Sequence, residues 1–232
     1  MDPSWTNFLQ EELKKEYMIK LRAFVSEREK EVNVFPARKN LFRPFELCRY
    51  QMVKVVIIGG EPYPSYNADG LAFSVSQGSL PGALKNILEE VHIDYYKGNT
   101  GKVNTAQTGD LKQWADQGVL LLNSVLTTEQ DGTSHKGKGW EIFIENLVTW
   151  LSSTHPHHIA FLLWGSQAYN FEKFIDKKKH LVLTAEHPAT GSFKEAWFGC
   201  NHFTKANEFI KKHYWGQKSL IEWGTYKNYK FL

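Results

Sequence analysis

Four polar segments of the sequence carry residue types that can do chemistry, and each follows an apolar run. They contain Glu61 (GGEPYPSYN), Asn123 (NSVLTT), Ser166 (WGSQ) and His187 (EHPATGS). A carboxylate and an imidazole together can stabilise developing charge and activate water, and an amide can pair with the polar edge of a ligand. Taken singly, such residues are more often a solvated loop acid, a core amide or a turn histidine. Their shared position after apolar runs favours a catalytic site.

The apolar runs are the elements that must position these groups. They are short, rich in valine, isoleucine and leucine, and end in glycine or polar residues, which predicts buried strands. The expected strands cover residues 53–59, 118–126, 158–165 and 180–188. Stretches with helical character precede the last three strands, at 82–93, 140–152 and 167–176. Strands that alternate with helices predict an α/β fold around a central, mainly parallel sheet, whose ligands gather at the carboxyl ends of the strands.

The remaining chain predicts scaffold. Residues 5–30 carry apolar side chains, among them Phe8, Leu13 and Leu21, at a spacing that indicates an amphipathic surface helix. With 232 residues, of which 42% are hydrophobic, the chain can bury a sizeable core within the usual size of one domain. No repeat, low-complexity tract or break in composition marks a linker. We therefore expect residues 1–232 to form a single domain.

Charge and composition bear on the compartment and the partners. The formal net charge of +3 and the pI near 8.7 are compatible with a phosphate-binding face, and equally with an ordinary enzyme. No stretch reaches the roughly 18 consecutive apolar residues that a membrane span needs, and acids stand where a signal peptide has its apolar core. Cys48 and Cys200 are too few for a disulfide framework or a zinc cluster. We expect a cytoplasmic protein with no membrane association, metal or cofactor.

Several segments, in this order, resemble the signature segments of the family 1 uracil-DNA glycosylases. GGEPYPS and DGLAFSV are similar to the family's GQDPYHG and HGLAFSV, and LLLNSVLT is similar to its LLLN-VLT strand. WGS, HPATGS and WFGCNHFTKANEFI resemble its WGS, its HPSPLS loop and its FFGC-HFSK-NE segment. The resemblance runs from about residue 34 to residue 223. It implies an α/β/α sandwich with a four-stranded sheet and an enzyme of base excision repair, which flips uracil out of DNA and hydrolyses its N-glycosidic bond.

The resemblance also implies roles for individual residues. Breaking this bond gives the sugar oxocarbenium character and releases a base anion, so a site needs negative charge near the sugar and a donor at the base O2. Glu61 is expected to position water and stabilise the sugar, and His187 to stabilise the base anion as a neutral imidazole. Asn123 is expected to pair with O4 and N3 of uracil, and Phe73 to stack on its face. Tyr63 is expected to exclude thymine by collision with the C5 methyl group.

Further residues are expected to contact the DNA. By resemblance, Ser65, Ser166 and Ser192 hydrogen-bond the phosphates that flank the flipped nucleotide, which fixes its register without reading sequence. Gly60 belongs to the segment beside the base, and Gly191 to the loop that penetrates the DNA. DNA, single- or double-stranded, is therefore the expected partner. A proteinaceous inhibitor of the DNA-binding face is a second candidate partner, and the chain is expected to be a monomer.

The segment around Glu61 departs from the family pattern. Glu61 replaces an aspartate, and the added methylene moves the carboxylate by about 1 Å, a misplacement that can cost about a hundredfold in rate. Gly60 replaces a glutamine, Pro64 replaces a histidine, and the segment up to Gly70 is one residue shorter than in the family. These changes predict a remodelled pocket floor.

The DNA-penetrating loop departs as well. Gly191 stands in place of the family's intercalating leucine, and Glu195 stands near a position that is basic in the family. Because glycine cannot fill the space that a flipped base leaves, we expect weaker engagement of duplex DNA. Phe193 and Trp197 are candidate substitute wedges.

Three functional hypotheses follow. The first is release of uracil from DNA. The second keeps the fold but changes the substrate to a 5-substituted uracil, such as 5-hydroxymethyluracil in phage DNA, with or without strand cleavage, and is motivated by the altered segment 60–69. The third is a catalytically impaired DNA-binding protein, motivated by Glu61, Pro64 and Gly191.

Overall fold

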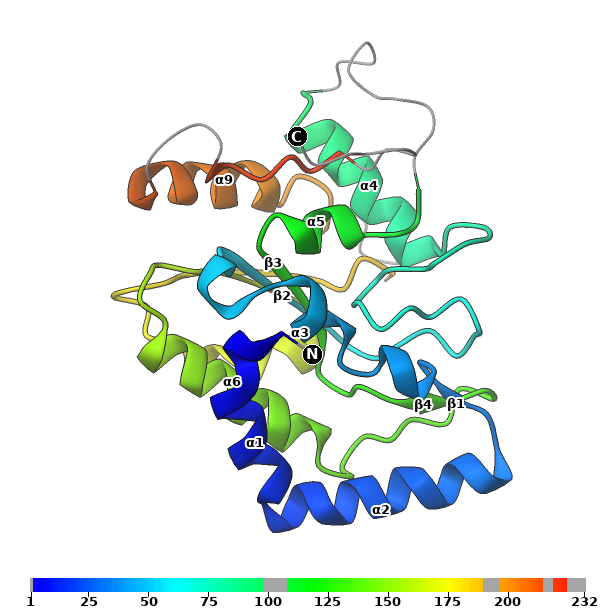
Figure 1. Ribbon diagram of the computed structural model, residues 1–232. Helices are drawn as coiled ribbons and strands as arrows, with labels where there is room; N and C mark the ends of the chain where they lie inside the picture. The colour runs from blue at the N-terminus through cyan, green and yellow to red at the C-terminus, as the bar shows by residue number, and fades with distance from the viewer. Residues whose placement is uncertain (1, 98–107, 190–196, 215–218, 225–232) are drawn as a thin grey trace.

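A four-stranded parallel sheet forms the centre of the molecule (Figure 1). The computed structural model describes residues 2–97, 108–189, 197–214 and 219–224. The strands are β2 (Val55–Gly59), β3 (Val119–Asn123), β5 (Ala160–Trp164) and β6 (Leu181–Ala185). They lie in the order β3-β2-β5-β6, and each neighbouring pair is parallel. The predicted sheet is confirmed, and all four carboxyl ends meet at one edge.

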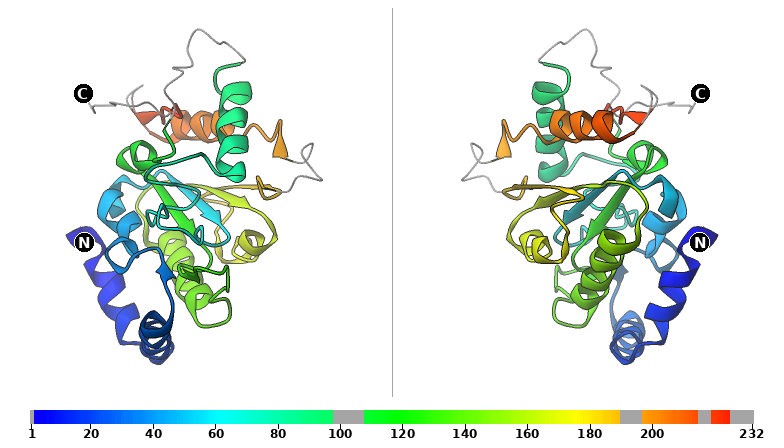
Figure 2. Two further views of the ribbon diagram at one scale, coloured as in Figure 1. Left: turned by 90° about the vertical axis from the view of Figure 1, so that its right-hand side faces the viewer. Right: turned by 90° about the vertical axis from the view of Figure 1, so that its left-hand side faces the viewer.

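Helices cover both faces of the sheet, which confirms the predicted sandwich. In Figure 1, α1 (Thr6–Lys14), α2 (Glu16–Glu31) and α6 (Trp140–Thr154) lie below the sheet. Above it lie α4 (Gly82–Asp94), α5 (Lys112–Asp116) and α9 (His202–His213), and both views in Figure 2 show the same layers. The short α3 (Arg43–Leu47) packs against β3 and α5. The expected helices at 82–93 and 140–152 are thus confirmed to within two residues.

Alternate strand residues face the two layers, which explains why the strands are apolar throughout. Val56 and Ile58 belong to the core beneath the sheet, whereas Val55 and Ile57 belong to the core above it. All four side chains are fully buried. A strand that is covered on both faces needs an apolar residue at every position, so its sequence is a continuous apolar run.

The prediction of one helix over residues 5–30 is wrong. Lys15, with φ −66° and ψ 145°, is extended and separates α1 from α2. Glu12, at the end of α1, is only 3% exposed, and its carboxylate accepts hydrogen bonds from Lys15, Tyr17 and Asn146. These bonds anchor the turn between the helices. Each helix has its own apolar face. Because the apolar residues of α1 are followed directly by those of α2, their spacing in the sequence resembled that of one longer helix.

Short elements complete the fold. The expected helix at 167–176 is wrong in length, since the chain forms only α7 (Ser166–Tyr169) and a 3-10 turn (Glu172–Phe174) before it extends at Ile175. Three further 3-10 turns cover Pro3–Trp5, Arg38–Asn40 and Tyr50–Met52. A two-residue antiparallel pair joins β1 (Val34–Phe35) to β4 (Thr128–Glu129). Such short strands have no sequence period, so they were not predicted.

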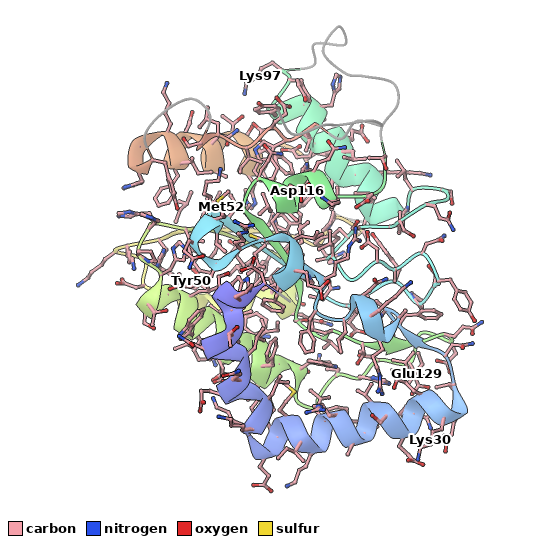
Figure 3. The ribbon with its side chains drawn as sticks, viewed as in Figure 1. Lys30, Tyr50, Met52, Lys97, Asp116 and Glu129 are labelled. Atoms are coloured by element: carbon pink, nitrogen blue, oxygen red, sulfur yellow. The ribbon has the colours of Figure 1, made fainter. Side chains whose placement is uncertain are left out.

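A buried ion pair anchors the chain that follows β3. Glu129 lies just above α2 in Figure 3 and is 4% exposed. Its carboxylate accepts hydrogen bonds from Arg28 Nε at 2.7 Å and Arg28 Nη2 at 3.0 Å, and it lies 3.2 Å from His135 Nε2. The Arg28 guanidinium lowers the pKa of Glu129 to about 2. The carboxylate therefore stays charged at neutral pH and holds β4 against α2.

Candidate active site

Gly59, the last residue of β2, forms the floor of a small space between an aromatic ring and an amide. A β-carbon built on Gly59 would lie 2.6 Å from Cζ of Phe73 and 3.1 Å from Oδ1 of Asn123. Contacts this short leave no room for a side chain, so only glycine fits here. The absent side chain lets the Phe73 ring and the Asn123 amide approach the same backbone position. Asn123, which ends β3, is 4% exposed.

Phe73 is held in a backbone conformation that non-glycine residues rarely adopt. Its φ is +63°, in the left-handed region. The buried Asp69 carboxylate fixes the surrounding turn, since it accepts hydrogen bonds from Leu71 N at 3.1 Å and Ser74 Oγ at 2.7 Å, and lies 2.6 Å from an Arg43 guanidinium nitrogen. Strained residues held by their surroundings cluster at functional sites. This turn places the Phe73 ring over Gly59.

His187 lies just beyond β6, and the centroid of its ring is 5.6 Å from the centroid of the Phe73 ring. Its Nδ1 accepts a hydrogen bond from the backbone N–H of Ala189 at 3.1 Å. Burial lowers the pKa of His187. The imidazole is therefore neutral at pH 7, and because Nδ1 accepts, its proton is on Nε2. This is the tautomer that can donate a hydrogen bond to a departing base.

A pocket of about 400 Å³ opens beside these residues. Small-molecule sites occupy roughly 300–1,000 Å³. It is lined by Gly60, Glu61, Trp164, Gly165, Ser166, Gln167 and His187. Four residues that the sequence singled out therefore meet at one place, although they follow three different strands. The pocket brings a carboxylate and a neutral imidazole together.

Gly165 allows His187 to approach the end of β5. Its φ is +92°, and a β-carbon there would lie 3.0 Å from Cβ of His187. Both the backbone conformation and the close contact require glycine at this position. The sequence motif WGS includes Gly165 but does not predict this role, although its place directly after a buried strand was a signal for it.

The ends of β2 and β3 are joined by hydrogen bonds that the sequence did not predict. Ser124 Oγ lies 2.8 Å from Gly60 O and 3.1 Å from Gln167 Oε1, so its one O–H donates to an acceptor on either side of it. The Ser124 N–H donates to Gly59 O at 3.0 Å. Gln167 Oε1 is the nearest atom to a β-carbon built on Gly60, at 3.5 Å. Thus the Gln167 amide lies on the side of Gly60 where a larger side chain would begin. The remodelling of the pocket floor stays a prediction.

Tyr63 and Ser65 lie on the loop that follows Glu61. The Tyr63 hydroxyl donates to the backbone oxygen of Phe73 at 3.4 Å, and burial raises the pKa of this phenol, so it stays neutral. Ser65 Oγ accepts the Asn67 N–H at 3.2 Å. Tyr63 thus contacts the Phe73 turn, but neither Tyr63 nor Ser65 lines the pocket. Ser166 is exposed and does line it.

The DNA-penetrating loop lies largely outside the described residues. Gly191, Ser192 and Phe193 all fall in the range 190–196, so their predicted roles stay predictions. Trp197 is described, and the hypothesis that it acts as a wedge is wrong. It is 1% exposed and packs edge-on against Trp164, with ring centroids 4.9 Å apart.

In the part of the chain that the structure describes, no three histidine, cysteine, aspartate or glutamate side chains are grouped so that they could hold a metal ion. Within the same ranges, no helix has both the length and the apolar character that crossing a bilayer requires.

Comparison with known proteins gives consistent matches. The model of the uracil DNA glycosylase superfamily matches residues 45–211. The uracil-DNA glycosylase of Aliarcobacter butzleri is 41% identical over 212 residues, which cover 90% of this chain and 96% of that protein. The uracil-DNA glycosylase of Amoebophilus asiaticus is 42% identical over 214 residues, which cover 91% of this chain and 94% of that protein.

Solved structures agree with the sequence relatives. The crystal structure of mimivirus uracil-DNA glycosylase superimposes with a TM-score of 0.81 at 26% identity, covering 97% of this chain and 87% of that one. A mutant of the mimivirus protein was crystallised in complex with UGI. A structure from Nitratifractor salsuginis, with a TM-score of 0.61 at 20% identity over 89% of this chain and 91% of that one, shares the fold. By its sequence match over most of its length, this chain belongs to the uracil-DNA glycosylase superfamily.

Proposed function

We propose that this chain hydrolyses the N-glycosidic bond of uracil in DNA, after the nucleotide has rotated out of the stack. The observation that carries the proposal is that Glu61 and His187 line one pocket, while the Phe73 ring lies beside the His187 ring. Phe73 and the Asn123 amide both lie against Gly59. These groups supply what the reaction requires on the sugar side and on the base side of the bond.

On the sugar side, Glu61 supplies the negative charge. As the bond lengthens, positive charge builds on the sugar, and a carboxylate in the pocket stabilises it more than water does. The same carboxylate orients a water molecule toward the anomeric carbon and accepts its proton as the new bond forms. The Ser124 hydroxyl lies within hydrogen-bond distance of both Gly60 O and Gln167 Oε1, and so holds the backbone next to Glu61.

On the base side, His187 supplies a neutral donor. Uracil leaves as an anion with charge on O2, and the Nε2–H of His187 donates to that oxygen. Because Nδ1 already accepts the Ala189 N–H, the ring does not turn to present its other nitrogen. Burial disfavours the protonated ring, so the donor strengthens as charge develops on O2 instead of transferring its proton to it.

Asn123, Phe73 and Tyr63 read the base. The Asn123 amide has one acceptor and two donors, which match N3–H and O4 of uracil and mismatch the reversed pattern of cytosine. The Phe73 ring stacks on the base over Gly59. Tyr63, held by its bond to Phe73 O, faces C5 and leaves no room for the methyl group of thymine.

Replacing Tyr63 with alanine is therefore expected to admit thymine. The substitution removes the ring that collides with the methyl group but leaves Asn123 to pair with the same O4 and N3 edge. The measurement is release of thymine from an oligonucleotide with a T·G pair, compared with wild type. The control is Tyr63→Phe, which retains the ring and should still reject thymine. Equal thymine release by both variants would contradict this role.

The contacts with DNA follow the same proposal. Ser65, Ser166 and Ser192 bind phosphates on either side of the flipped nucleotide, and Gly191 enters the stack without filling it. The chain acts as a monomer and as one domain, in keeping with a single sheet shared by both cores. An inhibitor of the kind that binds the mimivirus protein would have to cover the pocket lined by Glu61 and His187.

The test is incubation of purified protein with matched oligonucleotides that contain uracil, thymine or 5-hydroxymethyluracil, in single and double strands. Free base is read by mass spectrometry and strand breaks by gel electrophoresis. Release of uracil with an alkali-labile site and no direct break is the expected result. Preference for 5-hydroxymethyluracil, or direct scission, would support the second hypothesis. Binding without any product would refute the proposal in favour of a DNA-binding protein.

A further inference from the structure

One face of α4 carries three polar side chains four residues apart, Asn86, Glu90 and Asp94. This spacing stacks them along a single helix face. Glu90 and Asp94 are 0% and 1% exposed, although carboxylates are rarely buried without partners. α4 and α9 lie in the same layer of the molecule (Figure 2). The three side chains bond to described residues between Pro188 and Thr204.

Their partners follow one another in sequence. Glu90 accepts hydrogen bonds from Gly199 N at 2.8 Å and Asn201 N at 3.1 Å. Asp94 accepts one from Thr204 N at 2.9 Å. The two carboxylates thus accept hydrogen bonds from backbone N–H groups just before α9 and in its first turn. They anchor residues 199–204 to α4.

Asn86 anchors the part next to the active site. Its Nδ2 donates to Pro188 O at 2.6 Å, and its backbone oxygen accepts the indole N–H of Trp197 at 3.1 Å. These two bonds hold the chain on both sides of positions 190–196. Asn86 therefore fixes the residue that directly follows His187.

The Pro188–Ala189 peptide connects Asn86 to the imidazole. Its oxygen accepts the Asn86 amide, and its N–H, on Ala189, donates to Nδ1 of His187. A peptide group is planar, so holding the oxygen also sets the direction of the N–H. A hydrogen bond to the oxygen further polarises the N–H and strengthens its own bond.

We propose that Asn86 is a positioning residue that acts on His187 through the Pro188–Ala189 peptide. By fixing this peptide it keeps Nδ1 as an acceptor and the proton on Nε2. Its kinetic consequence rests on the proposed function, in which that Nε2–H stabilises the departing base, but its effect on the imidazole does not. Asn86 itself touches neither the base nor the sugar.

The first test reads the imidazole directly. Nitrogen-15 NMR of the histidine side chains, with His187 assigned by its loss in His187→Gln, is expected to show a protonated Nε2 in the wild type. Asn86→Ala and the isosteric Asn86→Asp, which removes the donor, are expected to shift both ring nitrogens toward the average of the two tautomers. The matched control is Asn207→Ala, since Asn207 also donates to a backbone oxygen, that of Ile221, at 2.8 Å. An unchanged His187 spectrum in both Asn86 variants would overturn the proposal.

The second test uses single-turnover uracil release. Asn86→Ala is expected to slow release on the order of a hundredfold, as for a displaced catalytic group, and Asn207→Ala to leave the rate near wild type. In a His187→Ala background the Asn86 substitution should have no further effect, because coupled residues are not additive. If the rate reductions of the two single variants multiply in the double variant, Asn86 does not act through His187. A wild type that releases no uracil would refute the proposed function, and the NMR test would still decide the role of Asn86.

Discussion

Replacing Glu61 with glutamine is expected to slow uracil release by about a thousandfold, within the range for loss of a positioned acid or base. Glutamine keeps the size of the side chain but removes the charge that stabilises the sugar and the acceptor for the proton of water. The measurement is the single-turnover rate on a single-stranded uracil oligonucleotide, because single strands avoid the cost of opening a duplex. Binding of the oligonucleotide should change little.

The matched variant Glu61→Asp tests the length of the side chain. If the extra methylene only displaces the carboxylate, aspartate should raise the rate above that of the wild type. The structure offers a second outcome with a physical reason. Gln167 lies against Gly60 in the pocket that Glu61 lines, and in a pocket that fits the longer acid aspartate would lower the rate. A glutamine variant as active as the wild type would contradict the role of Glu61 under either outcome.

Replacing His187 with alanine is expected to lower the rate by about two orders of magnitude, or about 3 kcal/mol of transition-state stabilisation, as for loss of one oxyanion donor. The donor acts on charge that exists only as the bond breaks, so kcat should fall and binding should persist. The control is His158→Ala, which is expected to retain wild-type activity. His158 is half-buried and outside the pocket lining, and its ring stacks on that of His213 with centroids 3.9 Å apart. Full activity of His187→Ala would refute its assignment.

The rate should also depend on pH through His187. Burial lowers the pKa of this imidazole, so the neutral form persists below the ordinary range of a histidine near 6.5. Protonation would add a hydrogen to Nδ1, which accepts the Ala189 N–H in the neutral ring. The two N–H groups would then point at each other, and this hydrogen bond would be lost. The rate is therefore expected to stay level from pH 8 to about 6.5 and to fall only at lower pH. A fall that begins above pH 7 would contradict a neutral His187.

The strands could be predicted because their environment dictates their composition. Val55 to Ile58 are covered on both faces, and only a continuous apolar run satisfies both cores. The positions of Glu61, Asn123 and His187 followed, since parallel strands end at one edge. The break at Lys15 could not be predicted, because it depends on the burial of Glu12 against residues of α2 and α6.

The hydrogen bonds that position the site residues could not be predicted from the sequence. Glu90 and Asp94 have the composition of a solvated helix face, and nothing local shows that α9 covers them. The burial of Trp197 was not predicted, because its contacts with Asn86, 111 residues away in sequence, and with Trp164 join distant segments. Contacts between distant segments thus decided which polar residues are buried, and a single sequence does not carry that information.

The glycines at the strand ends also have a genetic consequence. The first two positions of every glycine codon are G·C pairs, and an unrepaired cytosine deamination at either converts the codon to serine, arginine, aspartate or glutamate. At Gly59 the new β-carbon would lie 2.6 Å from Phe73, and at Gly165 it would lie 3.0 Å from His187. The lesion that this enzyme removes is therefore also one that disables its own gene at these codons. A lineage that loses the activity acquires more changes of the kind that prevent its return.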